Sequence, residues 1–491
     1  MSELELKFCV PPEALPSLRE ALIAHGATVL PLKATYYDTA DGALARRLMA
    51  LRLRQEGERL VQTFKASGNS PVHRLEHEVW VVPGEGRPAI DVSRHNGHRA
   101  GSLLREALGD KPALVAQQGS DIERLVCTVT DASGCTIEIA LDVGHVSAGR
   151  RKAPIAEVEL EHKDGPLGGL FTLAADWVAH GGLWLSTITK AARGHRLQSA
   201  QAPAAVRASQ IDLDAEPDLD SDAFVRAALR ATLAQVLPNA SEIAEGSTDA
   251  DVVHQLRIGL RRLRTALREL APLSGHIDPD WQAALGEAFA RLGEQRDRDA
   301  VLEAVQHLLA AAGIEAPRAP SSTHIDLAAA LHATAFQRAL LGTLALVHAD
   351  GPGQPMLKER ATLAVVARRL DRLHRRVRRD GPRFHELPLD GQHRVRKQLK
   401  RLRYLAEFAA PLWKPKEAAD YLDRLKSAQD ELGHHNDVAV AVSIYRQHAD
   451  DPAQQRAADH LQAHLGKTGR SARDALKKIR NRHRFWPKAR D

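Results

Sequence analysis

The chain has 491 residues, 44% of them hydrophobic and 26% charged, and a formal net charge of +6. This composition fits a soluble globular protein, and the length exceeds what one hydrophobic core usually serves, so at least two domains are expected. No uncharged apolar run approaches the roughly 18–20 residues that cross a bilayer, and no signal peptide is recognisable. With three cysteines in no metal-type spacing (Cys9, Cys127 and Cys135), a cytoplasmic protein without membrane association is expected.

The first 200 residues alternate apolar and polar side chains with a period of two. Seven segments are predicted as strands on this basis: ELELKF, MALRLRQ, RLVQTFK, HRLEHEVWVV, RLVCTVT, CTIEIALDV and IAEVELEH. EGE at 56–58 and DASG at 131–134 are typical of hairpin turns. Residues 12–26 and 167–182 are predicted as helices that end at glycine. The pattern indicates an α+β domain built on an antiparallel sheet.

From about residue 220 the apolar spacing becomes three and four, which is typical of helices. Helices are expected at 221–237, 251–272, 280–293, 298–312, 325–348, 357–379, 391–411, 416–432, 436–448 and 452–480. Residues 198–222, rich in Ala, Asp and Pro, are interpreted as a linker. The predicted domains are therefore 1–200 and 220–485, joined by a linker at 201–219.

The positive charge lies mainly in the helical half. Residues 1–200 contain 23 Lys and Arg against 24 Asp and Glu, whereas residues 357–404 contain 16 against 5. Such a segment attracts a polyanion, and nucleic acid, anionic lipid and inorganic polyphosphate are all candidates at this point.

Charged side chains share one face of each predicted strand, beginning with Glu3, Glu5 and Lys7 in ELELK. On one strand, a solvated outer face is the simpler interpretation. Dense charge on five segments instead favours faces that converge inside a barrel, because like charges along one strand repel. Clustered carboxylates suit a hard cation such as Mg²⁺ or Mn²⁺, and clustered Arg and Lys suit phosphate. The pattern therefore predicts a cavity for a metal-complexed oligophosphate.

The N-terminal half resembles the CYTH superfamily, the triphosphate tunnel metalloenzymes. The resemblance is carried by E-x-E-x-K at the N-terminus and, in order, YYDT, LRLR, TFK, RLEHE, IEIALD, EVELE and TKAARG. It implies an eight-stranded antiparallel β-barrel tunnel that hydrolyses inorganic triphosphate. By this resemblance the metal ligands are Glu3, Glu5, Asp142, Glu157 and Glu159, and the phosphate ligands are Lys7, Arg52, Arg54, Lys65, Arg124 and Lys190.

The candidate catalytic residues are Glu5, Glu78 and Lys7. A carboxylate orients a water for in-line attack on a terminal phosphorus while the cation neutralises charge. The sequence does not choose between Glu5 and Glu78 for this role.

The helical half contains an internal repeat. HQLRIGLRRLR at 254–264 matches HRVRKQLKRLR at 393–403, and LGEQRD at 292–297 matches LGHHND at 432–437, at nearly the same offset. In each repeat, one helical face combines a histidine with basic residues. A single basic helix is usually a solvated surface, but matched positions in two repeats favour a binding face, and these donors suit phosphate oxygens.

This half resembles the CHAD domain, which implies two duplicated four-helix bundles facing each other across a groove that binds inorganic polyphosphate. By resemblance the groove residues are His254, Arg257, Arg261, Arg264, His393, Arg396, Lys400 and Arg403. The expected protein is a metal-dependent inorganic triphosphatase with a polyphosphate-binding module. The alternatives are an adenylate cyclase, a thiamine triphosphatase, or a non-catalytic scaffold that binds polyphosphate or RNA, although nucleic acid is not the favoured partner.

Overall fold

The computed structural model describes residues 2–68, 70–82, 89–109, 113–199, 204–213, 219–293, 296–317, 326–348, 356–447, 451–480 and 484–488; the side chains of 2, 3, 296–299 and 480 lie outside this description. The chain forms two compact units. The first comprises Met1–Ala208, Leu233–Leu256 and Leu327–Gly351, and the second comprises Ser209–Thr232, Arg257–Asp326 and Pro352–Asp491. Within the described residues, no helix is both long and apolar enough to span a membrane.

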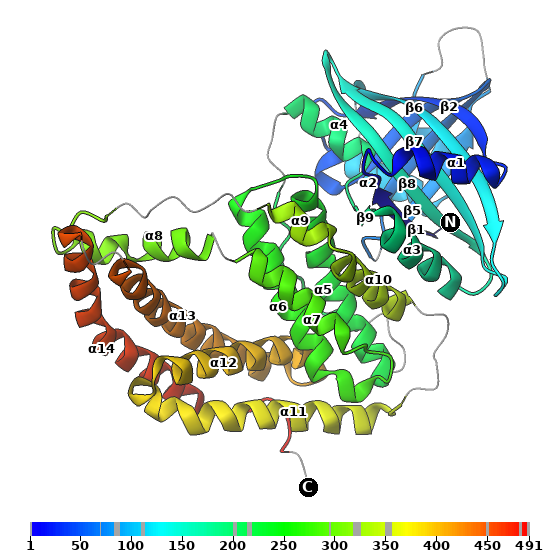
Figure 1. The fold of residues 1–491 in the computed structure, drawn as a ribbon. Coiled ribbons are helices and arrows are strands. Elements are labelled where there is room, and N and C mark those ends of the chain that lie inside the picture. Colours follow the sequence, from blue (N-terminus) through cyan, green and yellow to red (C-terminus); the bar gives the residue numbers. More distant parts are fainter. Residues whose placement is uncertain are drawn as a thin grey trace. The chain divides into compact units, whose positions relative to one another are not determined.

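The first unit contains a closed antiparallel barrel of eight strands (Figure 1). The strands are β1 (Ser2–Cys9), β2 (Thr28–Asp38), β3 (Ala50–Glu56), β4 (Arg59–Ser67), β5 (His73–Trp80), β6 (Val115–Thr130), β7 (Thr136–Ala148) and β8 (Arg151–Asp164). The beginning of β1 pairs with β5 and its end pairs with β8, which closes the barrel. A ninth strand, β9 (Trp184–Leu185), is added beside the end of β1. The predicted barrel fold is confirmed.

Helices cover the outer face of the barrel because that face carries its apolar side chains. They are α1 (Leu15–Ala24), α2 (Arg99–Leu108) and α3 (Gly168–Gly181). A fourth helix, α4 (Lys190–Ser199), packs instead on a cluster that includes the inward-facing Leu32 and Ile122. Leu51 and Phe64 of neighbouring strands are fully buried in one core with Leu104 of α2. Another helix, α3, packs against β8. The alternation of ELELKF corresponds to burial in the structure, because Leu4 and Leu6 are buried.

Helix α4 is the element that closes the polar interior. It contacts β6, β7 and β8, and its Leu197 packs on an apolar cluster that includes Leu32, Ile122, Val146 and Ile155. The apolar layer anchors the helix, and the first residue of the helix, Lys190, reaches the charged layer.

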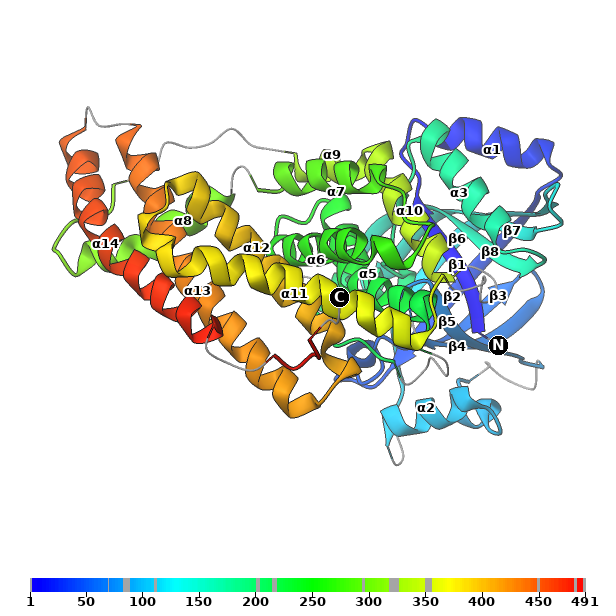
Figure 2. The same cartoon turned by 90° about the horizontal axis from the view of Figure 1, so that it is seen from below.

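The rest of the chain is helical wherever secondary structure is described. The helices are α5 (Ser221–Ala244), α6 (Ala250–Glu269), α7 (Asp280–Arg291), α8 (Arg296–Ala310), α9 (Leu327–His332), α10 (Thr334–His348), α11 (Glu359–Asp380), α12 (Leu389–Ala409), α13 (Pro415–Arg446) and α14 (Pro452–Arg480). In the second unit α11 lies beside α12, and α13 lies beside α14 (Figures 1 and 2). The all-helical class is confirmed.

Several sequence-based predictions of secondary structure differ from the structure. The helix predicted at 325–348 is two helices, α9 and α10, and neither α2 nor α4 was predicted. The predicted helices at 416–432 and 436–448 form one helix, α13. Gly433 at the predicted break simply continues the helix, at a cost of roughly 1 kcal/mol relative to alanine, and a methyl group there would meet no other atom within 4 Å. The strand β2 was not predicted, since TVLPLKATYYD contains a proline and alternates poorly.

Candidate functional site

The interior of the barrel holds a cavity of about 190 Å³ with charged walls. Strand pairing aligns its carboxylates, because Glu161 lies opposite Glu5 on one side and Glu138 on the other. Inward-facing residues of all eight strands and of α4 line the cavity: Glu5, Leu32, Arg52, Arg54, Lys65, Glu76, Glu78, Ser120, Ile122, Arg124, Glu138, Asp142, Glu159, Glu161, Lys163 and Lys190. Both signs of charge therefore converge in one enclosed space.

Three carboxylates form the acidic centre of the site. Asp142 and Glu157 are opposite each other on β7 and β8, and Glu159 follows two residues later on the same face. One ligand oxygen from each lies within 4.8 Å of the others. Asp142 and Glu157 are almost completely buried, so these acids require a positive partner.

The ammonium of Lys190 lies among these three carboxylates. It is 2.7 Å from Asp142 Oδ2 and 2.9 Å from Glu159 Oε1, and it also donates to Glu157. Burial alone would lower the pKa of Lys190, but the three acids raise it well above its usual value. Lys190 is therefore firmly charged.

Arg124 provides the second positive charge. Its guanidinium donates to both oxygens of Asp142, at 2.6 and 2.7 Å, and to Glu159 Oε2 at 2.7 Å. Burial would raise the pKa of Asp142 and Glu159, but Lys190 and Arg124 outweigh burial and lower both. Both carboxyls are therefore ionised at neutral pH.

The acidic centre fits a hard divalent cation by the chemistry of its donors. Its three carboxylates supply the oxygen ligands that Mg²⁺ and Mn²⁺ prefer. Glu157 Oε2 is buried without a hydrogen-bond partner among the described residues, and the Lys7 ammonium stays 3.7 Å away. An oxygen in this state retains a lone pair for a cation.

Arg52 is the side chain best prepared for an anion. It is buried and hydrogen-bonded to Tyr36, but its Nε and Nη2 have no hydrogen-bond partner among the described residues. Burial would lower the pKa of Arg52, whereas Tyr36 and Glu76 raise it, so the side chain stays charged. Two buried, unused N–H donors in a charged cavity are suited to phosphate oxygens.

The remaining predicted phosphate ligands of the cavity wall are paired with acids. Arg54 lies 3.2 Å from Glu78, and Lys65 lies 2.5 Å from Glu76. Glu78 also accepts a hydrogen bond from the Thr63 hydroxyl at 3.1 Å. These pairs keep the cations pointed into the cavity until an anion competes for them.

Two residues of the E-x-E-x-K motif are not part of the three clustered carboxylates, although the Lys7 ammonium lies 3.7 Å from Glu157 Oε2. Lys7 is 5% exposed, donates to the Ile188 carbonyl and does not line the cavity; burial lowers its pKa. Glu5 lines the cavity but is not one of the three clustered carboxylates. The predicted metal ligand Glu3 has its side chain outside the described residues.

Sequence reasoning missed several lining residues. Glu76, Glu138 and Glu161 had the right alternation but were not selected as site residues, and Ser120 and Lys163 gave no signal. Burial raises the pKa of Glu161, although Lys163 at 2.7 Å opposes this. Glu76, Glu138 and Glu161 extend the acidic wall beyond the centre.

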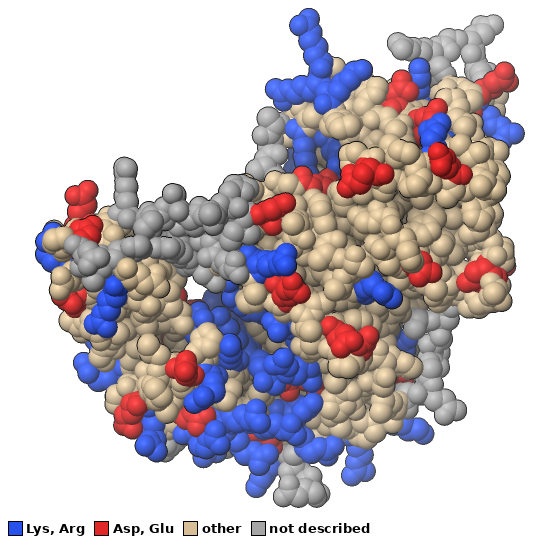
Figure 3. Space-filling view, viewed as in Figure 1, with Lys and Arg blue, Asp and Glu red and all other residues tan. Residues whose placement is uncertain are grey.

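The second unit carries a separate basic cluster, defined here as Arg257, Arg261, Arg396 and Lys400. Figure 3 shows Lys and Arg gathered over α11 and α12 around a hollow. Arg257 and Arg261 both lie over the Phe289 ring, at 5.2 and 4.8 Å. Burial, followed by Arg261 and Arg396, lowers the pKa of Lys400 to about 6. The cations of both repeats thus repel one another at one place, which favours a polyanion.

The other predicted groove residues have different surroundings. Arg403 donates to Glu407 at 2.9 Å, and Arg264 has a lowered pKa because of burial and Arg268. His393 is exposed on α12. Partial burial of its ring, followed by the nearby positive charge of Lys397, lowers its pKa. His254 is exposed on α6 in the part that belongs to the first unit.

Two protein families match the chain. Residues 1–195 match the CYTH domain and residues 227–446 match the CHAD domain. An inorganic triphosphatase of Haemophilus influenzae is 31% identical over 209 residues, which are 41% of this chain and 56% of that protein. The chain thus matches little more than half the length of this relative.

Solved structures of both kinds are similar to parts of the chain. The CHAD domain of the plant Ricinus communis is 25% identical with a TM-score of 0.45, over 58% of this chain and 99% of that one. A Hippeastrum protein named as a candidate adenylyl cyclase with a dominant triphosphatase activity is 17% identical with a TM-score of 0.28, over 41% of this chain and 97% of that one.

Proposed function

Because the chain belongs to the proteins that join a CYTH domain to a CHAD domain, we propose that it is a metal-dependent inorganic triphosphatase that also binds polyphosphate. The observation that carries the proposal is that one cavity is lined both by Arg52, with its unused donors, and by Asp142 and Glu159 of the acidic centre. The products are pyrophosphate and phosphate.

The charges of the cavity define two sets of ligands. Asp142, Glu157 and Glu159 would hold Mg²⁺ or Mn²⁺, which when bound supplies positive charge at the phosphate oxygens. Arg52, Arg54 and Lys65 bind the phosphate chain from the opposite wall. Arg124 and Lys190 are held by the acids, so their donors reach phosphate only when another cation satisfies those acids.

The attacking water needs a carboxylate, and both Glu5 and Glu78 line the cavity. Each can accept a proton from water on the way to the terminal phosphorus. Comparing E5Q with E78Q decides between them, because the base variant loses kcat while the other retains most of it.

Size and lining favour the inorganic substrate over ATP and thiamine triphosphate. The cavity of about 190 Å³ is smaller than the roughly 300–1,000 Å³ of pockets that enclose organic ligands. No aromatic residue lines it within the described part of the chain, so a base or thiazole ring would find no stacking partner there. The same features argue against a cyclase.

The first test measures phosphate release from inorganic triphosphate, ATP and thiamine triphosphate, with and without Mg²⁺ or Mn²⁺. We expect metal-dependent release from inorganic triphosphate to exceed the others at least tenfold. Arg52→Met should raise KM at least tenfold, since it removes the two unused donors. Release from none of the three would leave a binding protein and would refute the enzymatic proposal.

The basic cluster is proposed to bind inorganic polyphosphate. An inorganic polyphosphate chain is flexible and carries one charge per phosphate, so it can neutralise Arg257, Arg261, Arg396 and Lys400 together. It has no nucleobases, so its binding needs no base-specific contact. Labelled long-chain polyphosphate should bind the full chain at physiological salt, and an equal charge of RNA should displace it at least tenfold less well. RNA that competes equally would contradict the proposal.

A cytoplasmic location is proposed as well. Cys9, Cys127 and Cys135 are all buried free thiols, which persist in a reducing compartment. The proposed partners are inorganic triphosphate and inorganic polyphosphate, and no membrane association is proposed.

A further inference from the structure

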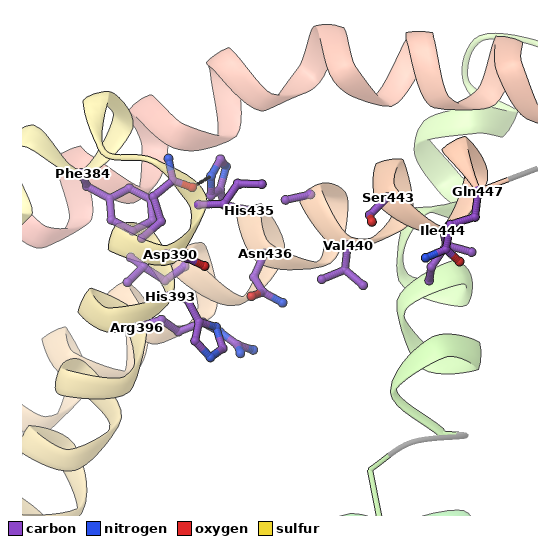
Figure 4. Close-up of a pocket in the computed structure, with 14 residues that line it drawn as sticks. Phe384, Asp390, His393, Arg396, His435, Asn436, Val440, Ser443, Ile444 and Gln447 are labelled. Carbon is purple, nitrogen blue, oxygen red and sulfur yellow. Dashed lines mark hydrogen bonds between the residues drawn. The ribbon is translucent and has the colours of Figure 1, made fainter. Parts of the chain in front are cut away.

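A second cavity, of about 410 Å³, lies in the second unit between α12, α13 and the short helix η4 (Gly381–Glu386). Figure 4 shows His393 and Arg396 of α12 and Asn436 and Val440 of α13 pointing toward the same space. This volume is about twice that of the barrel cavity and falls within the usual range of organic ligand pockets.

The wall of this cavity has an apolar and a polar part. Leu389, Val440 and Ile444 give apolar surface. Asn436, Ser443 and Gln447 lie on the same face of α13 as Val440, since their spacing is seven and eleven residues, and they offer amide and hydroxyl groups. A ligand that fits must therefore be mostly apolar or aromatic and carry several hydrogen-bonding atoms.

The back of the cavity is held rigidly. Both ring nitrogens of His435 are hydrogen-bonded, Nε2 with Gln392 Oε1 at 2.8 Å and Nδ1 with the Thr468 hydroxyl at 2.8 Å. The Phe384 ring meets the His435 ring edge-on at 5.4 Å. Both residues are buried, so the cavity is formed before any ligand binds.

The rim of the cavity continues into the basic cluster. Arg396 lines the cavity, and it is close enough to Lys400 and Asp437 to influence the ionisation of both. Lys400 in turn interacts with Arg261 and Arg257. A ligand in the cavity can thus extend an anionic tail along the basic cluster, and the electrostatic potential is positive along the whole path of that tail.

We propose that this cavity binds the nucleoside of a nucleoside polyphosphate whose phosphates lie along the basic cluster. The proposal rests on the polyphosphate-binding function proposed above. A base is flat and largely apolar on its faces, and its edge presents the donors and acceptors that Asn436, Ser443 and Gln447 can pair with. Asp390 on the same wall can accept from ribose hydroxyls. A lipid tail would leave these polar groups unsatisfied.

The test displaces labelled long-chain polyphosphate from the full chain, in EDTA to prevent hydrolysis, with adenosine 5′-tetraphosphate or inorganic tetraphosphate. We expect the nucleotide to act at a concentration at least tenfold lower. Val440→Trp fills the cavity and should abolish that advantage while polyphosphate affinity stays within twofold. Ser427→Trp adds the same ring at an exposed site of α13 and should keep the advantage.

The outcomes separate the two proposals. Equal potency of the two tetraphosphates, with the label bound, overturns the nucleoside site and leaves polyphosphate binding intact. An advantage that persists in V440W, with a native circular dichroism spectrum, also overturns it. If labelled polyphosphate does not bind at all, the basic-cluster function fails, and the nucleoside site that depends on it fails too.

Discussion

Replacing Glu159 by glutamine is expected to lower kcat/KM for inorganic triphosphate at least 100-fold. Glu159 is one of the three clustered carboxylates and accepts from both Lys190 and Arg124. The amide keeps the size of the side chain but removes its charge, so a cation loses one of three anionic ligands. Its N–H₂ group also faces two cationic donors. A 100-fold loss corresponds to about 2.7 kcal/mol of transition-state stabilisation.

The matched control is Glu123→Gln. Glu123 precedes Arg124 on β6 but points outward, where it is 46% exposed and paired with Arg19 at 2.6 Å. E123Q should retain the activity within twofold. Binding of Mn²⁺, followed by electron paramagnetic resonance, should weaken in E159Q and stay unchanged in E123Q. An E159Q protein that keeps both its rate and its metal affinity would exclude the acidic centre as the metal site.

The barrel could be predicted from the sequence because apolar and polar residues alternate strongly along its strands. Seven of the eight barrel strands have a charged interior face and an apolar outer face, and their hairpins turn at glycines with positive φ, as at Gly57 and Gly134. The exception is β2, whose Pro31 and mixed pattern obscure the period. Its identity depends on pairing with β3 and β6, which is non-local information.

The composition of the site was also visible, but its internal pairing was not. Alternation indicates which residues face inward. A cavity that brings acidic and basic side chains together was therefore predictable. Which cation meets which acid depends on how α4 enters the barrel, and that is fixed by Leu197 on an apolar cluster from four strands. The sequence therefore could not show that Lys190 lies among Asp142, Glu157 and Glu159, or that Lys7 lies outside the cavity wall.

The affinity of the basic cluster for polyphosphate is expected to rise as the pH falls from 8 toward 6. Burial lowers the pKa of Lys400, Arg261 and Arg396 add to this effect and Asp437 opposes it, and together they bring the pKa to about 6. Lys400 is therefore mostly neutral in the free protein above pH 6. A bound polyanion favours the charged form and raises this pKa, so binding takes up a proton. The affinity then increases by up to about tenfold per pH unit and levels off below pH 6, where Lys400 is charged in both states.

Lys400→Arg distinguishes this coupling from a general effect of pH. Arginine stays protonated throughout this range, so K400R should bind more tightly at pH 8 and lose the proton uptake, measured by titration calorimetry in two buffers of different ionisation enthalpy. Lys397→Arg makes the same change at an exposed position one turn earlier on α12 and should behave as the wild type. His393 titrates below its usual range because of burial and nearby cations, so its share of the proton uptake remains in both variants. Equal proton uptake by K400R and the wild type would assign the pH dependence to the histidine and remove Lys400 as its source.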